Sequence, residues 1–160
     1  MNLADISEQL KAPFSAREVK LKPQSVDKER CKALALPYID ARAVQDRLDH
    51  VVGPGDWSDS YQVVAAGNRL AVICRLTVLG VTKEGIGEPG GTPGEEAIKS
   101  AESDALKRAA VKFGVARYLY GLPRRWLAYD GRKFTEVYPF PGQQPSGPKA
   151  SQQRQAEARR

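Results

Sequence analysis

The pattern of polar and apolar residues near the N-terminus predicts a short helix. Acidic side chains early and Lys11 at the end predict a helix over residues 3–10, and Pro13 stops it. Residues 16–27 look extended or irregular and are interrupted by Pro23. The first structured element that this pattern predicts is therefore brief and is followed by a segment without regular helical character.

A second, longer helix is predicted over residues 38–52. Its apolar residues recur at helical spacing, which is typical of an amphipathic helix with one buried face. These residues are Ile39, Ala43 or Val44, Leu48, and Val51 or Val52. Pro37 stands just before the expected start, and the Gly-Pro-Gly segment at 53–55 ends the helix.

The hydrophobic period then becomes alternating, which predicts strands. We expect strands over residues 57–65 and 70–81, joined by the turn Ala-Gly-Asn at 66–68. In the second strand, one face would hold Val72, Cys74, Leu76 and Val78, and the other Arg75, Thr77 and Leu79. A tight turn at 83–85 would lead to a weaker strand around Ile86. Three successive strands with short connections predict an antiparallel meander.

The longest helical segment is predicted over residues 95–119. Glu95 and Glu96 favour its N-terminus, and Gly121 and Pro123 end it. An alanine-rich stripe suits it to lie across a sheet face, and its members are Ile98, Ala101, Ala105, Ala109, Ala116 and Leu119. We therefore predict an α+β fold, in which a three-stranded antiparallel β-meander carries the long helix on one face.

The sequence from residue 126 onward predicts less regular secondary structure than the preceding segments. Residues 126–129 and 133–137 with a turn at 130–131 indicate a small hairpin. Beyond it the chain consists of Pro, Gln, Ser, Gly, Lys and Arg, a composition that does not build a core. We expect one ordered domain over residues 1–138 and a disordered basic tail over residues 139–160.

The amino-acid composition says more about the possible classes of function than about the fold. The 160 residues suit one ordinary domain. The net charge of +6 favours anionic partners such as nucleic acid, although a plain solvated surface gives the same charge. No apolar run is long enough to span a bilayer, and the first residues lack the order of a secretion signal. We therefore expect a cytoplasmic protein with no membrane partner.

Candidate chemistry is sparse. His50 is the single histidine, which argues against a His-rich metal site or a Ser-His-Asp triad, and Cys31 and Cys74 are expected to be reduced structural thiols. The glycine-rich segment 87–94 lacks the Gly-Lys-Ser/Thr ending of a phosphate loop. The carboxylates are scattered, which disfavours a two-metal nuclease. We predict no catalytic residue, no cofactor, no metal and no small-molecule substrate.

The long helix and the segment after it are rich in cations and aromatic rings. The cations are Lys99, Lys107, Arg108, Lys112, Arg117, Arg124, Arg125, Arg132 and Lys133. The rings are Phe113, Tyr118, Tyr120, Trp126 and Tyr129. Long cationic side chains contact phosphates, and unpaired bases stack on aromatic rings. From composition alone, a DNA-binding surface is no more favoured than a plain solvated helix face whose neighbouring aromatic residues are buried in the core. Phe113 in particular is expected to be a core residue.

A second basic surface could come from Arg42, Arg47, and Arg69 or Arg75. Three aspartates alternate with the first two arginines on the predicted helix, at positions 40, 46 and 49. Intrahelical ion pairing is therefore expected for at least one of those two arginines.

Two blocks of sequence resemble a known family. Residues 38–49 read YIDARAVQDRLD and precede Gly53 and Trp57, and residues 96–114 read EAIKSAESDALKRAAVKFG. Over roughly residues 30–125 the chain is similar to the RAD fifty-two superfamily of single-strand annealing proteins. The continuation RYLYGLP at 117–123 resembles its bacterial and phage branch.

The resemblance implies a β-β-β-α core, closed homo-oligomeric rings, and single-stranded DNA in a basic groove around the outside, with no ATP and no metal. By position, Lys107 and Arg108 match the groove-lining basic pair, and Lys99 matches another basic position. Arg42 is offset by one residue from a basic position, and Val111 replaces a basic residue of the eukaryotic pattern. Lys112 points about a third of a turn away from it. The predicted DNA-binding residues are Lys107, Arg108, Lys99, Lys112, Arg42 and Arg117.

The expected function follows from this resemblance. We expect a nucleoid-associated protein, not an enzyme, that holds phosphates, leaves bases exposed, shields 3′ ends from nucleases and promotes annealing. A double-stranded-RNA-binding module is the runner-up, because it also runs helix, three strands, helix. Glu95 and Glu96 occupy the helix start where its phosphate would dock, which disfavours it. The residues also leave open a nuclease and a purely structural oligomer.

Overall fold

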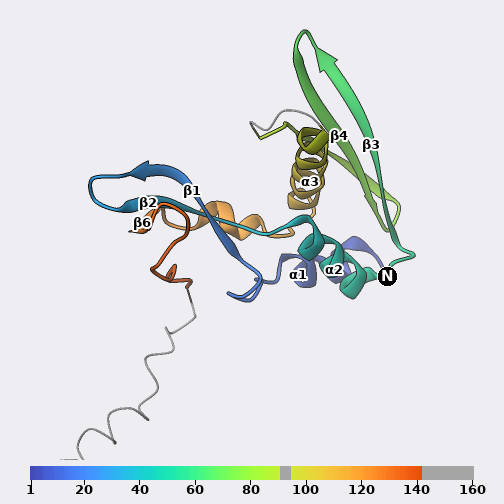
Figure 1. The fold of residues 1–160 in the computed structure, drawn as a ribbon. Helices are drawn as coiled ribbons and strands as arrows, with labels where there is room; N and C mark the ends of the chain where they lie inside the picture. The colour runs from blue at the N-terminus through green and yellow to red at the C-terminus, as the bar shows by residue number, and fades with distance from the viewer. Residues whose placement is uncertain (91–94, 142–160) are drawn as a thin grey trace, which may run out of the picture. The chain divides into compact units, whose positions relative to one another are not determined.

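The computed structural model describes residues 1–90 and 95–141. The predicted tail therefore lies outside the described residues from position 142 on, as does the second half of the glycine-rich segment, at 91–94. The fold is α+β, with three α-helices and two three-stranded antiparallel sheets among the described residues (Figure 1). The α+β class is confirmed, and the second sheet was not predicted.

The chain forms two compact units. The first contains Met1–Lys22 and Leu36–Arg124, and the second contains Pro23–Ala35 and the chain from Arg125 onward. The first unit holds α1 (Leu3–Lys11), α2 (Ala41–Val52), β3 (Trp57–Ala66), β4 (Arg69–Val78), β5 (Val81–Gly87), α3 (Glu95–Val111) and the 3-10 helix η1 (Arg117–Gly121). Strands β1 (Lys20–Asp27) and β2 (Lys32–Tyr38) run through both units, and β6 (Arg125–Ala128) belongs to the second.

The predicted meander is confirmed as the sheet β3-β4-β5. The buried face of β4 is the predicted one, since Val72, Cys74, Leu76 and Val78 are each at most 2% exposed. The turn predicted at 83–85 is wrong, because those residues lie inside β5 and the strands turn at Leu79 and Gly80. Both turn residues have positive φ, 48° and 77°, which matches the right-handed twist of the flanking strands.

Helix α3 packs closely on β5. A Cβ atom on Gly85 would overlap backbone atoms of Ala105 and Ala109, and a Cβ atom on Gly87 would overlap backbone atoms of Ala101 and Ala105. These three alanines are buried, as the predicted stripe required. The bare glycine backbone and the small alanine side chains therefore allow helix and strand to approach without intervening side chains.

The long helix ends earlier than predicted. It stops at Val111 rather than at 119, because Gly114 adopts a φ of 100° and Ala116 a φ of 56°, which are left-handed conformations that a helix does not accommodate. The chain then continues as the short η1. Ile98, placed in the stripe by its spacing, is instead 42% exposed.

Helix α2 also begins later than predicted. Tyr38 is the last residue of β2, and the helix starts at Ala41 after Asp40, whose Oδ1 accepts a hydrogen bond of 2.9 Å from the Ala43 backbone nitrogen. The predicted apolar stripe is confirmed, with Val44 rather than Ala43 as its buried member.

The second sheet has the order β1-β2-β6. Residues 32–35 of β2 pair antiparallel with residues 125–128 of β6. The predicted terminal hairpin is present as the antiparallel bridge between Tyr129 and Phe134, with a backbone hydrogen bond of 2.9 Å from the Thr135 nitrogen to the Ala128 oxygen. The additional pairing of β6 with β2 was not predicted. Nothing in the sequence near residue 126 encodes this long-range pairing.

Arg47 joins α2 to the end of α1. Its Nη1 donates to the carbonyl oxygens of Gln9, Leu10 and Ala12 at 3.2, 3.3 and 2.6 Å, and its guanidinium lies 4.0 Å from the centre of the Phe14 ring. A cation at this position satisfies carbonyls that the last turn of a helix leaves unpaired.

We expect Arg47→Ala to lower the free energy of unfolding by about 2 kcal/mol, because charged hydrogen bonds are lost. Arg47→Lys keeps the charge but not the geometry of the guanidinium, so it should recover only part of the loss. Denaturant unfolding measures both. An unchanged midpoint for Arg47→Ala would show that these hydrogen bonds do not stabilise the fold.

Among the described residues, the helices are all too short or too polar to cross a lipid bilayer.

Candidate nucleic-acid interface

The first unit contains a groove of about 240 Å³ beside α3. Its walls come from the ends of β1 and β2, from α2, from the second half of α3 and from η1. Three cations line it, namely Lys22, Lys107 and Arg108, together with the carboxylate of Asp104. Two of these three cations are the residues that the sequence placed first among the candidate phosphate contacts.

Tyr38 holds two of these cations in place. The Lys22 and Lys107 ammonium groups lie 5.4 Å and 5.6 Å from the centre of its ring. Such contacts are electrostatically favourable, because the face of an aromatic ring carries negative charge. The ring therefore brings together two lysines that are far apart in the sequence and that would otherwise repel each other.

The electrostatics of the groove favour an anion at Lys107. Partial burial lowers the pKa of Lys107, and the nearby Lys22 and Arg108 lower it further, while the carboxylates of Asp104 and Asp40 oppose the shift. Because the pKa of Lys107 is lowered overall, the surrounding groups and water do not fully stabilise the charge of its ammonium group. A phosphate bound here would supply the missing negative charge.

Arg108 is held by an acid one turn earlier on α3. Its Nε donates to Asp104 Oδ2 at 2.8 Å, and this hydrogen bond raises the pKa of the guanidinium. Both side chains remain substantially exposed, at 59% for Arg108 and 34% for Asp104. The contact uses only Nε, and within residues 1–90 and 95–141 no hydrogen bond occupies the two terminal nitrogens of the guanidinium, so they can donate to a phosphate.

The other predicted site residues lie outside the groove lining. Lys99 is exposed on α3, and Arg42 is exposed on α2 near the ion pair of Lys20 and Asp40, whose Nζ–Oδ2 distance is 2.7 Å. Lys112 is exposed just after α3. The structure therefore brings together two of the six predicted residues in the groove.

Arg117 has a structural contact that the sequence did not indicate. Its Nε and Nη2 donate to the Val111 carbonyl oxygen at 2.9 and 2.7 Å, and Nη2 also donates to the Lys112 carbonyl oxygen at 3.1 Å. Lys83 donates to the same Lys112 oxygen at 2.7 Å. Two cations therefore cap the C-terminus of α3 and offset the negative end of its dipole.

The second basic surface is largely compensated by acids. Arg69 pairs with Glu88 at 3.4 Å, and Arg75 pairs with Glu84 at 2.6 Å. The intrahelical pairing predicted for Arg42 or Arg47 is wrong for Arg47, which bonds to the carbonyls at the end of α1 instead.

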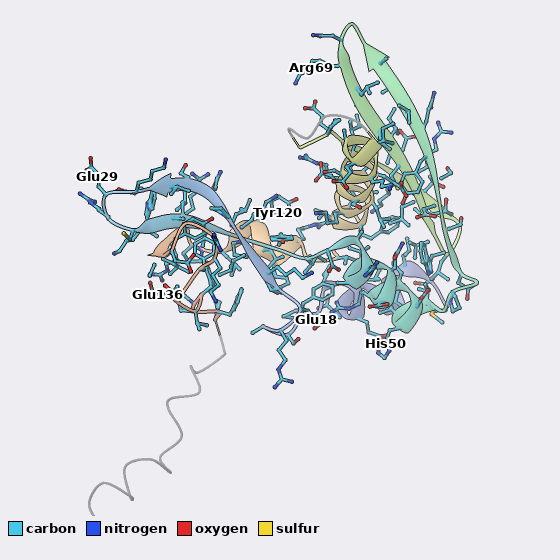
Figure 2. All side chains as sticks on the ribbon, viewed as in Figure 1. Glu18, Glu29, His50, Arg69, Tyr120 and Glu136 are labelled. Atoms are coloured by element: carbon cyan, nitrogen blue, oxygen red, sulfur yellow. The ribbon has the colours of Figure 1, made fainter. Side chains whose placement is uncertain are left out.

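The aromatic residues divide into core and surface. Phe113 is core as expected, with 7% exposure, and the Tyr118 hydroxyl accepts a hydrogen bond of 3.0 Å from the Phe14 backbone nitrogen. Tyr120 is different, because it lines the groove and is 76% exposed (Figure 2). Of the aromatic residues predicted within the first unit, Tyr120 is therefore the one placed to stack on a ligand.

Sequence reasoning missed Lys22 and Tyr38. Lys22 lay in a segment expected to be extended or irregular, without a defined strand, and Tyr38 was assigned to a helix. The alternation of Lys20, Leu21 and Lys22 is a strand signal that would have placed both lysines on one face. The pairing of Tyr38 with Lys107 depends on tertiary packing and leaves no local signal.

Comparisons with known proteins identify the family of this chain. The model of the "Rad52/22 family double-strand break repair protein" matches residues 2–135. The "Single-stranded DNA-binding protein DdrA" of Deinococcus radiodurans is 52% identical over 131 residues, which cover 81% of this chain and 62% of that protein. The protein of the same name from Deinococcus deserti is 50% identical over 140 residues, which cover 87% of this chain and 68% of that protein. The chain thus spans about two thirds of the length of these relatives, and it belongs to the Rad52/22 family of double-strand break repair proteins.

Proposed function

We propose that this chain binds single-stranded DNA through the groove beside α3 and protects its 3′ ends. The observation that carries the proposal is the convergence of Lys22, Lys107 and Arg108 on one groove, with an exposed Tyr120 at the same place. Cations release counterions from the DNA backbone, and an exposed ring offers stacking to unpaired bases. Relatives named as single-stranded DNA-binding proteins support the choice of ligand.

The groove is small, so one protomer would hold only a short piece of strand. We propose that protomers assemble into a closed ring, with residues 1–138 as the binding and assembling part. Successive grooves would then hold successive phosphates, and the linked contacts would raise the affinity without sequence readout. Bases between the held positions would remain free to pair with a complementary strand, which would allow annealing without ATP.

End protection tests the proposal directly. A single strand labelled at its 5′ end is incubated with a 3′→5′ exonuclease, with and without the protein, at several salt concentrations. We expect the full-length strand to persist in the presence of the protein and to be degraded as rising salt weakens binding. Degradation at the same rate with and without bound protein would contradict the protective role. Annealing of two complementary labelled strands is measured in parallel.

The pH dependence of binding should report on Lys107. Because its pKa is lowered, Lys107 loses its proton at a lower pH than an ordinary lysine, and phosphate binds the charged form. Affinity for DNA is therefore expected to be full at neutral pH and to fall as the pH rises through the pKa of Lys107. Lys107→Arg stays charged over this range and should lose less affinity. Parallel losses in both proteins would show that Lys107 does not contact phosphate.

Competing functions give distinct results with the same protein. A duplex-RNA-binding module would prefer double-stranded RNA over single-stranded DNA of equal length. A metal-dependent nuclease would cleave the strand in the presence of magnesium. A purely structural oligomer would assemble but bind neither nucleic acid.

A further inference from the structure

The floor of the groove is apolar, which a phosphate-binding groove does not require. Between the cations, the lining consists mainly of aliphatic side chains, among them Ile39, Val44, Val111, Val115 and Leu119. A phosphate oxygen placed against these side chains would lose its hydration without gaining a hydrogen bond. The floor therefore favours a group that is flat or apolar rather than an ionised one.

The size of the groove fits a heterocyclic ring. Its volume of about 240 Å³ corresponds to roughly eight water molecules, at about 30 Å³ of liquid volume each. A ring of similar heavy-atom count can displace this water and gain contact with the aliphatic floor. Several of the floor residues are firmly packed, since Ile39, Val44 and Val115 are each at most 3% exposed. The floor is thus preformed and does not need to open.

The rim of the groove supplies both a stacking face and the charges for the flanking backbone. Tyr38 already carries Lys22 and Lys107 over its ring. Tyr120 is 76% exposed and lies within electrostatic reach of Arg108. Tyr120 can therefore stack on a ring that enters the groove, while the cations at the rim meet the phosphates on either side.

We propose that the groove takes one nucleobase of the bound strand, seated on the aliphatic floor and stacked on Tyr120, while Lys22, Lys107 and Arg108 hold the adjacent phosphates. This inference rests on the proposed function, since it concerns the same groove and strand. It differs from a binding mode in which every base points away from the protein. A base held in this way is withheld from nucleases and from pairing, whereas its neighbours stay available.

A DNA strand that lacks bases distinguishes binding with one base in the groove from binding with every base pointing away from the protein. Binding of a labelled single strand is measured by fluorescence anisotropy and compared with a strand of equal length in which abasic residues replace the nucleotides. Base seating predicts that the abasic strand binds at least about tenfold more weakly, because stacking is lost while the phosphates are kept. Equal affinity for both strands would overturn base seating and leave the proposed function intact. Failure to bind either strand would overturn the proposed function itself.

Two variants locate the base. Tyr120→Ala removes an exposed ring and is expected to lower the preference for the base-bearing strand several-fold. Tyr61→Ala, which removes a partly exposed ring on β3 outside the groove lining, should leave it unchanged. Val111→Lys puts a cation on the aliphatic floor, so it should keep DNA binding and lose the preference for bases. If both groove variants retain the wild-type preference, the base does not sit in this groove and the proposal is overturned.

Discussion

Replacing Lys107 and Arg108 together by alanine is expected to weaken single-stranded DNA binding by about 100-fold or more. Each of these side chains can donate charged hydrogen bonds to phosphate, and such bonds contribute about 1.5–3 kcal/mol each. Removing two phosphate contacts should also lower the slope of log affinity against log salt by about 1.4, since each contact to a single strand contributes about 0.7. Fluorescence anisotropy over a series of salt concentrations measures both effects.

The matched control removes the same charge from another surface. Arg30 and Arg75 are exposed and paired with Asp27 and Glu84, and neither lines the groove, so the double alanine variant loses two positive charges outside it. We expect it to bind DNA nearly as well as the wild-type chain. Equal losses in the two double variants would mean that net charge, rather than the groove, holds the strand. Thermal unfolding of each variant separates loss of binding from loss of fold.

Gly87→Ala is expected to destabilise the fold by about 3 kcal/mol, at the upper end of the range for overpacked interiors. The new methyl group would meet backbone atoms of Ala101 and Ala105, which have no side-chain torsion by which to move aside. Helix α3 would therefore have to shift away from β5 as a unit. Chemical denaturation followed by circular dichroism measures the loss.

Gly55→Ala is the control for this substitution. A Cβ atom at Gly55 meets no heavy atom within 4 Å, and its φ is not in the left-handed region. We expect its stability to be unchanged or slightly increased, because alanine restricts the unfolded chain. If Gly87→Ala were as stable as Gly55→Ala, the close packing of α3 on β5 would be wrong.

The spacing of apolar residues along the sequence correctly predicted which faces of individual strands and helices are buried. The alternation of Val72, Cys74, Leu76 and Val78 predicted the buried face of β4, and the alanine stripe predicted the face by which α3 meets the sheet. The predicted ends of helices and strands were wrong where a turn lies within a continuous apolar segment. Leu79 and Gly80 turn the chain inside what looked like one long strand, and Gly114 ends α3 inside what looked like one long helix.

Long-range contacts account for most of what the sequence did not show. Strand β2 pairs with β6 over about ninety residues of intervening chain, and no local signal marks either strand as the partner of the other. The candidate site divides in the same way. Lys107 and Arg108 follow from the sequence block that contains them, but the contribution of Lys22 and Tyr38 depends on long-range contacts within the first unit.

Arginines were the hardest residues to assign from sequence. Arg47 and Arg117 look like surface cations, and the sequence placed Arg117 among the DNA contacts. In the structure, both guanidinium groups bond to the carbonyls at helix ends. A helix C-terminus attracts cations for the same electrostatic reason that DNA does, so composition does not separate the two roles.

A competition experiment tests the central claim most directly. A labelled single strand bound to the protein is displaced by unlabelled single-stranded DNA or by duplex DNA of the same length, at one fixed salt concentration. Binding through a groove that takes unpaired nucleotides predicts that the single strand competes at a concentration at least about tenfold lower than the duplex. Equal competition by the two would contradict the account, because it would mean that backbone charge alone is recognised.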